Sequence, residues 1–180
     1  FWECGYPRND ILVTGADRKK FKHKLGFNDD DRIVLIAPTF RPNNVKESGV
    51  RITEELDTKV FTEILEEKFG FKNIKYVLRC HHEVQSEVQK LPIYRNYVNG
   101  NLYDDMAEYL SIADILITDY SGSFFDFLLM KKPCFLLGLD YEEYKEKVGI
   151  ILDEADLPVR MNRSVSELLE NVKGFDNEVY

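Results

Sequence analysis

The sequence predicts an α/β fold, a Rossmann-like parallel sheet flanked by helices, and three observations support this class. Short, continuously apolar runs have the pattern of strands that are buried on both faces. These runs alternate with stretches in which apolar residues recur at helical spacing, as they do when helices cover both faces of a parallel sheet. Polar side chains follow the runs directly, at the edge where such sheets bind their ligands.

The composition fits one globular domain. The chain has 180 residues, 44% of them hydrophobic, with 12 Phe and 10 Tyr, which is enough for a sizeable core. We therefore predict a single domain over residues 1–180. The net charge of −8 argues against broad nonspecific binding of nucleic acid, although a local basic patch could still hold phosphate. No apolar run approaches the ~20 residues of a membrane span, and no signal peptide is visible. The chain starts at Phe1 rather than Met, which fits a piece of a longer protein.

The first half of the chain contains the clearest strand, because Ile33 to Ala37 is continuously apolar. Before it, Asp17 is placed to cap a basic helix and Gly26 to end it. We predict, in chain order, a loop-like start over residues 1–10, a helix from Asp17 to Leu25, a strand from Arg32 to Phe40, an irregular loop from Asn43 to Thr53, an amphipathic helix from Leu56 to Phe69 and a strand from Tyr76 to Leu78.

The second half continues the alternation. Ser164 and Glu167 form a capping box before the last helix, and Pro133 ends an earlier one. We predict a short third strand over Ile93 to Val98, a helix from Leu102 to Ala113, a strand from Ile115 to Thr118, a helix that contains Phe124 to Leu129, a strand from Cys134 to Leu137, a helix from Tyr141 to Lys147 and a final helix through Val172.

The stretch from Asp114 to Asp126 is the most informative part of the sequence. Its pattern predicts a strand, a tight turn and a helix in succession. The turn from Asp119 to Gly122 clusters Asp, Ser and Gly, and Ser121 or Gly122 lies where the helix cap should be. Backbone N–H groups are free at a helix N-terminus, so such a turn can bind phosphate. The plainer alternative is that Ser121 and Ser123 only cap a core helix.

Three predicted strand ends converge on one sheet edge. They carry Thr39 and Arg41, then Arg79 and His81, and finally Asp119, Ser121 and Ser123. Guanidiniums, an imidazole, hydroxyls and a helix N-terminus together suit a diphosphate better than a neutral ligand. Arg8 offers a further fork of donors from an N-terminal turn, although a solvated surface Arg would fit the same pattern.

Cysteine and histidine spacing argues against a metal site. Cys4, Cys80 and Cys134 show no CxxC spacing, and we interpret them as buried or idle thiols of a reducing compartment. His81 and His82 are adjacent, so we expect their side chains to diverge, and no further ligand lies at motif distance. We predict no metal. The basic run from Lys19 to Lys24 is more typical of a solvated helix face than of a binding patch.

Four motifs in a fixed order carry a resemblance to a known family. They are Gly5-x-Pro7-Arg8-Asn9-Asp10, Ala37-Pro38-Thr39-Phe40-Arg41, Leu78-Arg79-x-His81 and Ile117-Thr118-Asp119-Tyr120-Ser121-x-x-Phe124-Phe125-Asp126. From about Gly5 to Leu157 the chain resembles the CDP-glycerol glycerophosphotransferases, which are the teichoic-acid primases and polymerases. The resemblance implies the C-terminal, donor-binding half of a GT-B fold, without the N-terminal acceptor domain.

The resemblance also implies an activity and its partners. These enzymes transfer glycerol phosphate from CDP-glycerol to a hydroxyl of a lipid-linked polyol-phosphate or glycan acceptor on the cytoplasmic face of the membrane, and they release CMP. No cofactor is implied. Because we expect the general base in the absent N-terminal domain, we expect this chain to bind the donor without turnover.

The resemblance assigns roles to residues of the converging strand ends. Arg41 and His81 are the catalytic candidates, because by family similarity they hold the diphosphate. The resemblance implies that further residues bind substrate: Thr39, Ser121 and Gly122 as donors to the diphosphate, Ser123 as a substitute hydroxyl, Asp126 toward the ribose or cytidine, Asp119 as an orienting group for the turn, and Arg8 and Arg79 as cations.

Two departures from the family pattern leave specificity open. Gly122 stands where the family usually has a second Ser, and Leu157-Pro158-Val159-Arg160 stands where it often has Leu-Pro-Gly-Pro. Glycerol and ribitol donors therefore both remain candidates.

Three other functions are compatible with parts of the sequence. A GT-B nucleotide-sugar glycosyltransferase would use a similar pocket, and a non-catalytic nucleotide-binding regulator would share the fold. A receiver module of signalling proteins also has a strand that ends in Asp, as Asp119 does. It needs an acidic pair after its first strand, whereas Asp29 to Asp31 precede the strand here.

Overall fold

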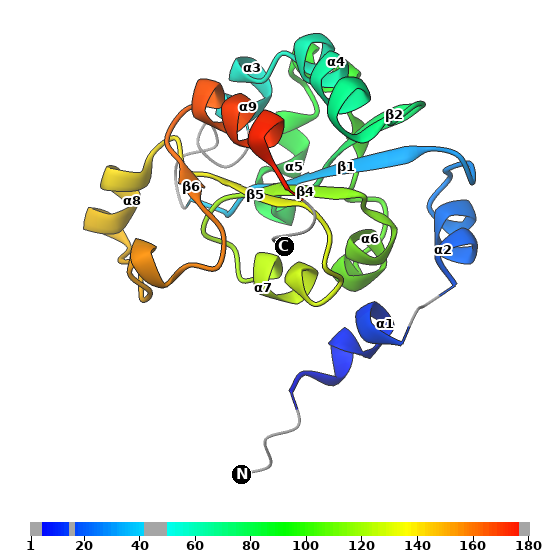
Figure 1. Ribbon diagram of the computed structural model, residues 1–180, viewed down its shortest axis with the longest axis horizontal. Coiled ribbons are helices and arrows are strands. Elements are labelled where there is room, and N and C mark those ends of the chain that lie inside the picture. The colour runs from blue at the N-terminus through cyan, green and yellow to red at the C-terminus, as the bar shows by residue number, and fades with distance from the viewer. Residues whose placement is uncertain (1–4, 15–16, 42–49, 177–180) are drawn as a thin grey trace.

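The computed structural model describes residues 5–14, 17–41 and 50–176, and its centre is one parallel sheet of six strands (Figure 1). The strand order is β3-β2-β1-β4-β5-β6, and every neighbouring pair is parallel. The strands are β1 (Arg32–Ala37), β2 (Ile74–Leu78), β3 (Val98–Asn99), β4 (Ile115–Thr118), β5 (Cys134–Leu137) and β6 (Met161–Asn162). The predicted Rossmann-like α/β fold is confirmed.

Nine α-helices occupy the described residues. They are α1 (Asp10–Val13), α2 (Arg18–Lys24), α3 (Arg51–Glu55), α4 (Thr58–Phe69), α5 (His82–Val88), α6 (Met106–Ile112), α7 (Ser123–Leu128), α8 (Tyr141–Lys147) and α9 (Val165–Gly174). Three 3₁₀ turns join them, η1 (Pro7–Asn9), η3 (Pro92–Asn96) and η4 (Glu154–Asp156). In the described part of the chain, no helix is both long enough and apolar enough to span a lipid bilayer.

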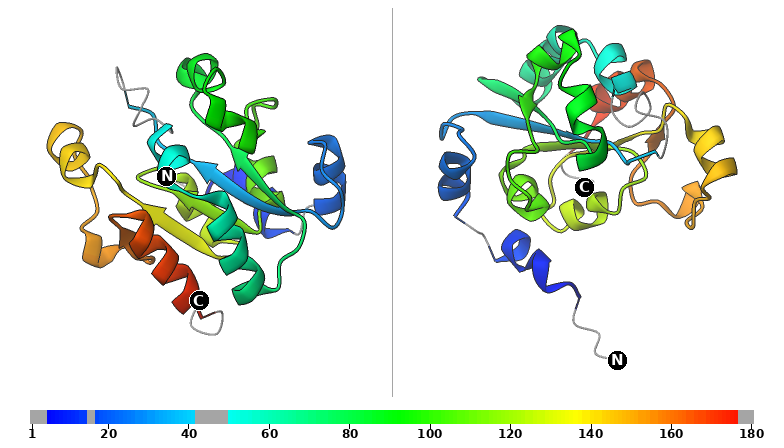
Figure 2. Two further views of the ribbon diagram at one scale, coloured as in Figure 1. Left: turned by 90° about the horizontal axis from the view of Figure 1, so that it is seen from above. Right: turned by 180° about the vertical axis from the view of Figure 1, so that it is seen from behind.

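The helices form a layer on each face of the sheet, which explains the apolar runs. In β1, Val34 and Ile36 point to the face that α4 and α9 cover, whereas Ile33 and Leu35 point to the face that α6 covers. Figure 1 shows α3, α4 and α9 on one side and α6 and α7 on the other, and Figure 2 shows the layers from two further directions. A strand covered on both faces is apolar at every position, not at alternate ones.

Short polar side chains begin several helices. Asp17, Asp57 and Asp105 each accept a hydrogen bond from a backbone N–H in the first turn of α2, α4 and α6. Ser164 does the same for α9 through the N–H of Glu167, as the sequence predicts. Asp105 also explains why α6 begins at Met106 rather than at Leu102, which is exposed.

Some predicted elements are confirmed and others are corrected. The strands at 115–118 and 134–137 and the helix at 141–147 have the predicted bounds. The third strand predicted over Ile93 to Val98 is wrong: Pro92 starts the 3₁₀ turn η3, and the strand is only Val98–Asn99. Of the loop predicted from Asn43 to Thr53, residues 43–49 lie outside the described part of the chain. Its last three residues, 51–53, belong to α3. Cys4 also lies outside the described residues.

The strand order positions the candidate site. β1 lies between β2 and β4, so the connections lead to opposite sides of β1 and the order reverses there. In open parallel sheets, ligands bind outside the carboxyl ends of the strands at such a reversal. The residues that follow β1, β2 and β4 therefore face one crevice.

Candidate functional site

A cavity of about 500 Å³ lies at the carboxyl ends of β1, β2 and β4. Its lining comes from the segments after these strands and from residues 101–106, which follow β3. The lining residues are Ala37, Pro38, Thr39, Phe40, Arg79, Cys80, His81, His82, Gln85, Asn101, Tyr103, Asp104, Met106, Ser121 and Ser123. The structure thus brings together Thr39, Arg79, His81, Ser121 and Ser123 of the predicted site.

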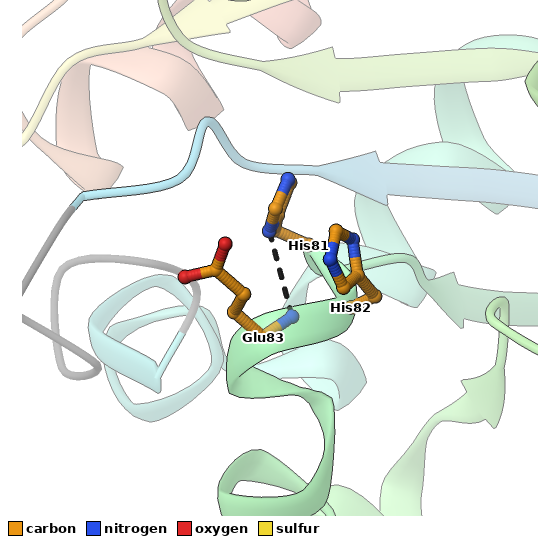
Figure 3. Close-up of side chains that lie close together, drawn as sticks. All are labelled: His81, His82 and Glu83. Carbon is orange, nitrogen blue, oxygen red and sulfur yellow. Dashed lines mark hydrogen bonds between the residues drawn. The ribbon is translucent and has the colours of Figure 1, made fainter.

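His81 lies at the N-cap position of α5, beside two other rings. Its ring stacks on Phe40, with centroids 4.5 Å apart, and lies 4.2 Å from the ring of His82. The Nδ1 atom accepts a hydrogen bond from the backbone N–H of Glu83 at 3.5 Å, which Figure 3 marks as a dashed line. When the imidazole is neutral, this contact places its proton on Nε2. His81 can therefore offer an Nε2–H donor, and a positive charge when it is protonated.

The turn after β4 places two hydroxyls in the cavity. The Oγ atoms of Ser121 and Ser123 lie 2.9 Å apart, and Ser121 Oγ accepts a hydrogen bond from the Ser123 N–H at 3.3 Å. Gly122 occupies the N-cap position of α7 and is exposed, but it is not part of the cavity lining. The two serines supply hydroxyl donors that an anion can use.

Thr39 lines the cavity, but both of its donors bind Asp119. One carboxylate oxygen of Asp119 accepts the Thr39 backbone N–H at 2.9 Å and its hydroxyl at 2.5 Å. The same oxygen accepts the Tyr120 N–H at 2.7 Å. A phosphate therefore finds no free donor on Thr39, contrary to the expectation from the resemblance. Asp119 thereby joins the ends of β1 and β4, and its expected role in orienting the turn stays a prediction.

Arg79 lines the cavity and also holds the segment after β3. Its guanidinium donates hydrogen bonds to the carbonyls of Gly100, Tyr103 and Asp104 at 2.6–2.7 Å, and it lies 5.1 Å from the centre of the Tyr109 ring. Burial lowers the pKa of Arg79 below its ordinary value. Arg79 therefore contributes charge to the cavity while most of its donors support the wall.

Gly100 is required where this segment passes β2. A Cβ atom at this position would lie 2.9 Å from both the Leu78 carbonyl oxygen and the Arg79 Cβ. Only a residue without a side chain allows so close an approach.

Arg41 does not reach the cavity, although the sequence places it at the same strand end. Its guanidinium binds both carboxylate oxygens of Asp140, at 2.8 and 2.9 Å, and Asp119 Oδ2 at 2.7 Å. It also packs against the rings of Tyr120 and Tyr144, at 5.0 and 4.9 Å. Burial alone would lower the pKa of Arg41, but the hydrogen bonds to Asp140 and Asp119 raise it above its ordinary value. Arg41 is thus the centre of a nearly buried ion network.

Arg8 and Asp126 lie together, away from the cavity lining. Asp126 accepts hydrogen bonds from Asn9 Nδ2 at 2.6 Å and from Arg8 Nη2 at 3.3 Å. These contacts attach the N-terminal turn η1 to α7. The expected contact of Asp126 with a ribose or base has no counterpart in this arrangement, because its carboxylate is occupied by Arg8 and Asn9.

His81, His82 and Glu83 gather at the start of α5, so the expected divergence of the two histidine side chains is wrong. The side chains of His81 and His82 do not diverge, and with Glu83 they offer ligand atoms within 4.8 Å of one another (Figure 3). All three ligands come from consecutive residues at the positive end of a helix, which disfavours a cation. The absence of a metal remains a prediction.

Sequence reasoning missed several residues of the site. Asn101 pairs with the backbone of Cys80 through both its amide nitrogen and its amide oxygen, and Cys80, His82, Gln85, Tyr103 and Met106 line the cavity. Burial raises the pKa of the Cys80 thiol to about 12. Asp140, Tyr120 and Tyr144 surround Arg41. The position of His82 next to His81 in the sequence could have indicated that His82 belongs to the site. Asp140 gave no such indication, because it follows β5, which is not one of the three strands whose ends were expected to converge.

The comparison with protein families decides which proteins this chain is related to. The model of the family described as CDP-glycerol:poly(glycerophosphate) glycerophosphotransferase matches residues 1–179. The chain belongs to this family. The resemblance inferred from the four motifs is thereby confirmed, and membership argues against a receiver module.

Named relatives and a solved structure agree with the family. The chain is 34% identical over 184 residues to a teichoic acid poly(glycerol phosphate) polymerase of Bacillus spizizenii, covering 96% of the chain and 44% of that protein. It is 31% identical over 183 residues to the polymerase of the same name of Bacillus subtilis, covering 99% of the chain and 24% of that protein. A variant of the wall teichoic acid polymerase TagF, soaked with CDPG, superposes with a TM-score of 0.70 at 27% identity, covering 99% of this chain and 43% of the chain in that structure. The chain thus spans less than half the length of these relatives.

Proposed function

We propose that this chain binds the donor in the transfer of glycerol phosphate from CDP-glycerol to a hydroxyl of a teichoic-acid or capsule-type polymer, with release of CMP. The observation that carries the proposal is the cavity at the strand-order reversal, which combines His81 with the hydroxyls of Ser121 and Ser123 in a chain of this family. Imidazole N–H, hydroxyl groups and a nearby guanidinium are donors that suit a diphosphate.

The chemistry of this transfer depends on position and charge. The phosphoryl group passes between two oxygens, so catalysis comes mostly from alignment and from neutralising charge on the leaving phosphate. His81 Nε2–H would donate to a diphosphate oxygen, and a protonated His81 would also neutralise part of its charge. Ser121 and Ser123 would bind the remaining oxygens, and Arg79 would contribute its charge from the cavity lining.

We propose that acceptor binding and general-base catalysis depend on residues that do not belong to this chain. The relatives are about two to four times as long as this chain. We propose that this chain is the C-terminal donor half of a GT-B enzyme, and that the acceptor site and the general base belong to a preceding half. We also propose that the acceptor is a lipid-linked polyol phosphate or glycan, reached from the cytoplasmic face of the membrane, and that this chain alone does not turn over its donor.

Calorimetric titration with four ligands tests the proposal: CDP-glycerol, CDP, CMP and a UDP-sugar. We expect CDP-glycerol and CDP to bind more tightly than the UDP-sugar, because the family donor carries cytidine and a diphosphate. Preference for the UDP-sugar would assign the chain to the nucleotide-sugar glycosyltransferases instead. If CDP-glycerol does not bind this chain, the proposal that the chain carries the donor site is wrong.

A further inference from the structure

An ion network lies beside the cavity without lining it. Arg41 forms its centre, and Asp119 and Asp140 are its two carboxylates. The side chains are only 9%, 6% and 6% exposed, respectively. None of the three belongs to the lining of the 500 Å³ cavity. The network therefore cannot act on a ligand in that cavity by direct contact.

Asp140 enters this network from a separate part of the sheet. It follows β5 and directly precedes α8, where its side chain makes no capping hydrogen bond. The carboxylate instead binds Arg41 through both oxygens and accepts the hydroxyl of Tyr120 at 2.9 Å. Burial opposes ionisation of Asp140, but the hydrogen bonds from Arg41 and Tyr120 lower its pKa. Asp140 thus remains charged and fixes the plane of the Arg41 guanidinium.

The Arg41 guanidinium also binds the turn that follows β4. Arg41 Nη1 binds one oxygen of Asp119, while the other oxygen accepts the N–H groups of Thr39 and Tyr120. Tyr120 directly precedes Ser121, whose hydroxyl reaches the cavity and contacts that of Ser123. Hydrogen bonds therefore lead from Asp140 through Arg41 and Asp119 to the Tyr120 N–H, and the backbone connects Tyr120 directly to Ser121.

We propose that Asp140 is a positioning residue for the diphosphate of the donor. Through Arg41 it fixes the carboxylate of Asp119, and through Asp119 it fixes the turn that presents Ser121 and Ser123. This inference rests on the proposed function, because it assigns the diphosphate to the same cavity. It also gives Arg41 a role that differs from direct contact with phosphate.

The first test compares Asp140→Asn with Asp114→Asn. Both residues are carboxylates with little exposure that bind arginine, but Asp114 precedes β4, accepts the Ile33 N–H at 2.9 Å and pairs with Arg32 at the opposite edge of the sheet. We expect Asp140→Asn to raise the Kd for CDP-glycerol about tenfold, and Asp114→Asn to change it less than about twofold. Both variants should unfold at lower temperature. Equal Kd values for Asp140→Asn and the unsubstituted chain would overturn the inference.

A double-mutant cycle separates positioning from general loss of stability. In a chain that carries Ser121→Ala and Ser123→Ala, the hydroxyls that Asp140 is inferred to position are absent. We therefore expect Asp140→Asn to raise the Kd less than about threefold in this background. The same tenfold rise in both backgrounds would show that Asp140 does not act through the serines, and would overturn the inference.

Tyr120→Phe provides a milder variant if Asp140→Asn does not fold. It removes only the hydroxyl that binds Asp140. We expect the Kd for CDP-glycerol to rise two- to threefold, because one of the hydrogen bonds that orient Asp140 is lost. An unchanged Kd would contradict the inference. If the unsubstituted chain binds CDP-glycerol but the variants bind equally well, only the inference fails. If the unsubstituted chain does not bind, the proposed function fails, and the inference fails with it.

Discussion

Asp119 accepts both hydrogen-bond donors of Thr39, the backbone N–H at 2.9 Å and the hydroxyl at 2.5 Å. The end of β1 is thereby joined to the turn after β4, across the point where the strand order reverses. A hydroxyl that is already donated to a carboxylate is not available to a phosphate oxygen. Thr39 should therefore shape the cavity more than it binds the ligand.

Thr39→Val tests this relationship. The variant keeps the backbone N–H and loses only the hydroxyl. We expect the free energy of unfolding to fall by about 1.5–3 kcal/mol, the usual net value of a hydrogen bond to a charged group, and the Kd for CDP to change less than about threefold. Urea denaturation and calorimetry measure the two quantities. A tenfold loss of affinity with unchanged stability would show that the Thr39 hydroxyl binds the ligand directly.

Arg41→Ala should lower the stability of the chain as well as its affinity for the donor. It leaves two carboxylates with little exposure, Asp119 and Asp140, without their cation, and the loss of one partner from a buried ion network costs about 3–5 kcal/mol. The sequence alone suggests instead a variant that folds normally and loses affinity. Urea denaturation distinguishes the two, with Arg8→Ala as the control, since Arg8 is exposed. Equal stability of both variants would contradict the ion network.

Gly100→Ala should destabilise the wall of the cavity. The added Cβ would lie 2.9 Å from the Leu78 carbonyl oxygen, so the segment after β3 must move away from β2. We expect a loss of about 1–3 kcal/mol in the free energy of unfolding. Gly174→Ala is a matched control, because a Cβ there meets nothing within 4 Å. If the two substitutions cost the same, the close approach at Gly100 is wrong.

Lys132 should make stability depend on pH. Burial, with a smaller contribution from Arg18, lowers the pKa of Lys132 to about 8, while its ammonium donates to the Ala113 carbonyl. Between about pH 8 and 10.5 the unfolded chain binds more protons at this residue than the folded chain does, so its contribution to the free energy of unfolding rises with pH.

Lys132→Met removes this contribution. The measured quantity is the unfolding free energy of the variant minus that of the unsubstituted chain. This difference should fall by about 2 kcal/mol as the pH rises from 8 to 10.5. Chemical denaturation at several pH values measures this difference, in which the titration of other groups cancels. Lys131→Met, at the exposed neighbouring position, serves as the control. A pH-independent difference for Lys132→Met would contradict the burial of this ammonium.

Much of the fold follows from local sequence patterns. The strands Ile115–Thr118 and Cys134–Leu137 were predicted with their bounds, because a run that is buried on both faces is apolar at every position. The convergence of Thr39, Arg79, His81, Ser121 and Ser123 was also predictable, since the carboxyl ends of neighbouring parallel strands meet at one edge.

Side-chain partners from distant parts of the chain were not predictable in this way. Arg41 turns away from the cavity because Asp140, 99 positions later, offers it two carboxylate oxygens. Asp126 is likewise occupied by Arg8 and Asn9, more than a hundred positions earlier. No local pattern contains these pairs. The helix α5 was missed for a different reason, because only Val84 and Val88 of its residues are buried and the apolar period is too short to recognise.

The most direct measurement of the central claim compares His81→Ala with His23→Ala by calorimetric titration with CDP. His81 lines the cavity, whereas His23 lies on α2 and pairs with Asp29 at the surface. Loss of a hydrogen-bond donor to a charged phosphate costs about 1.5–3 kcal/mol, so we predict at least a tenfold weaker affinity for His81→Ala and an unchanged affinity for His23→Ala. Unchanged affinity of a folded His81→Ala variant would contradict the assignment of this cavity to the diphosphate.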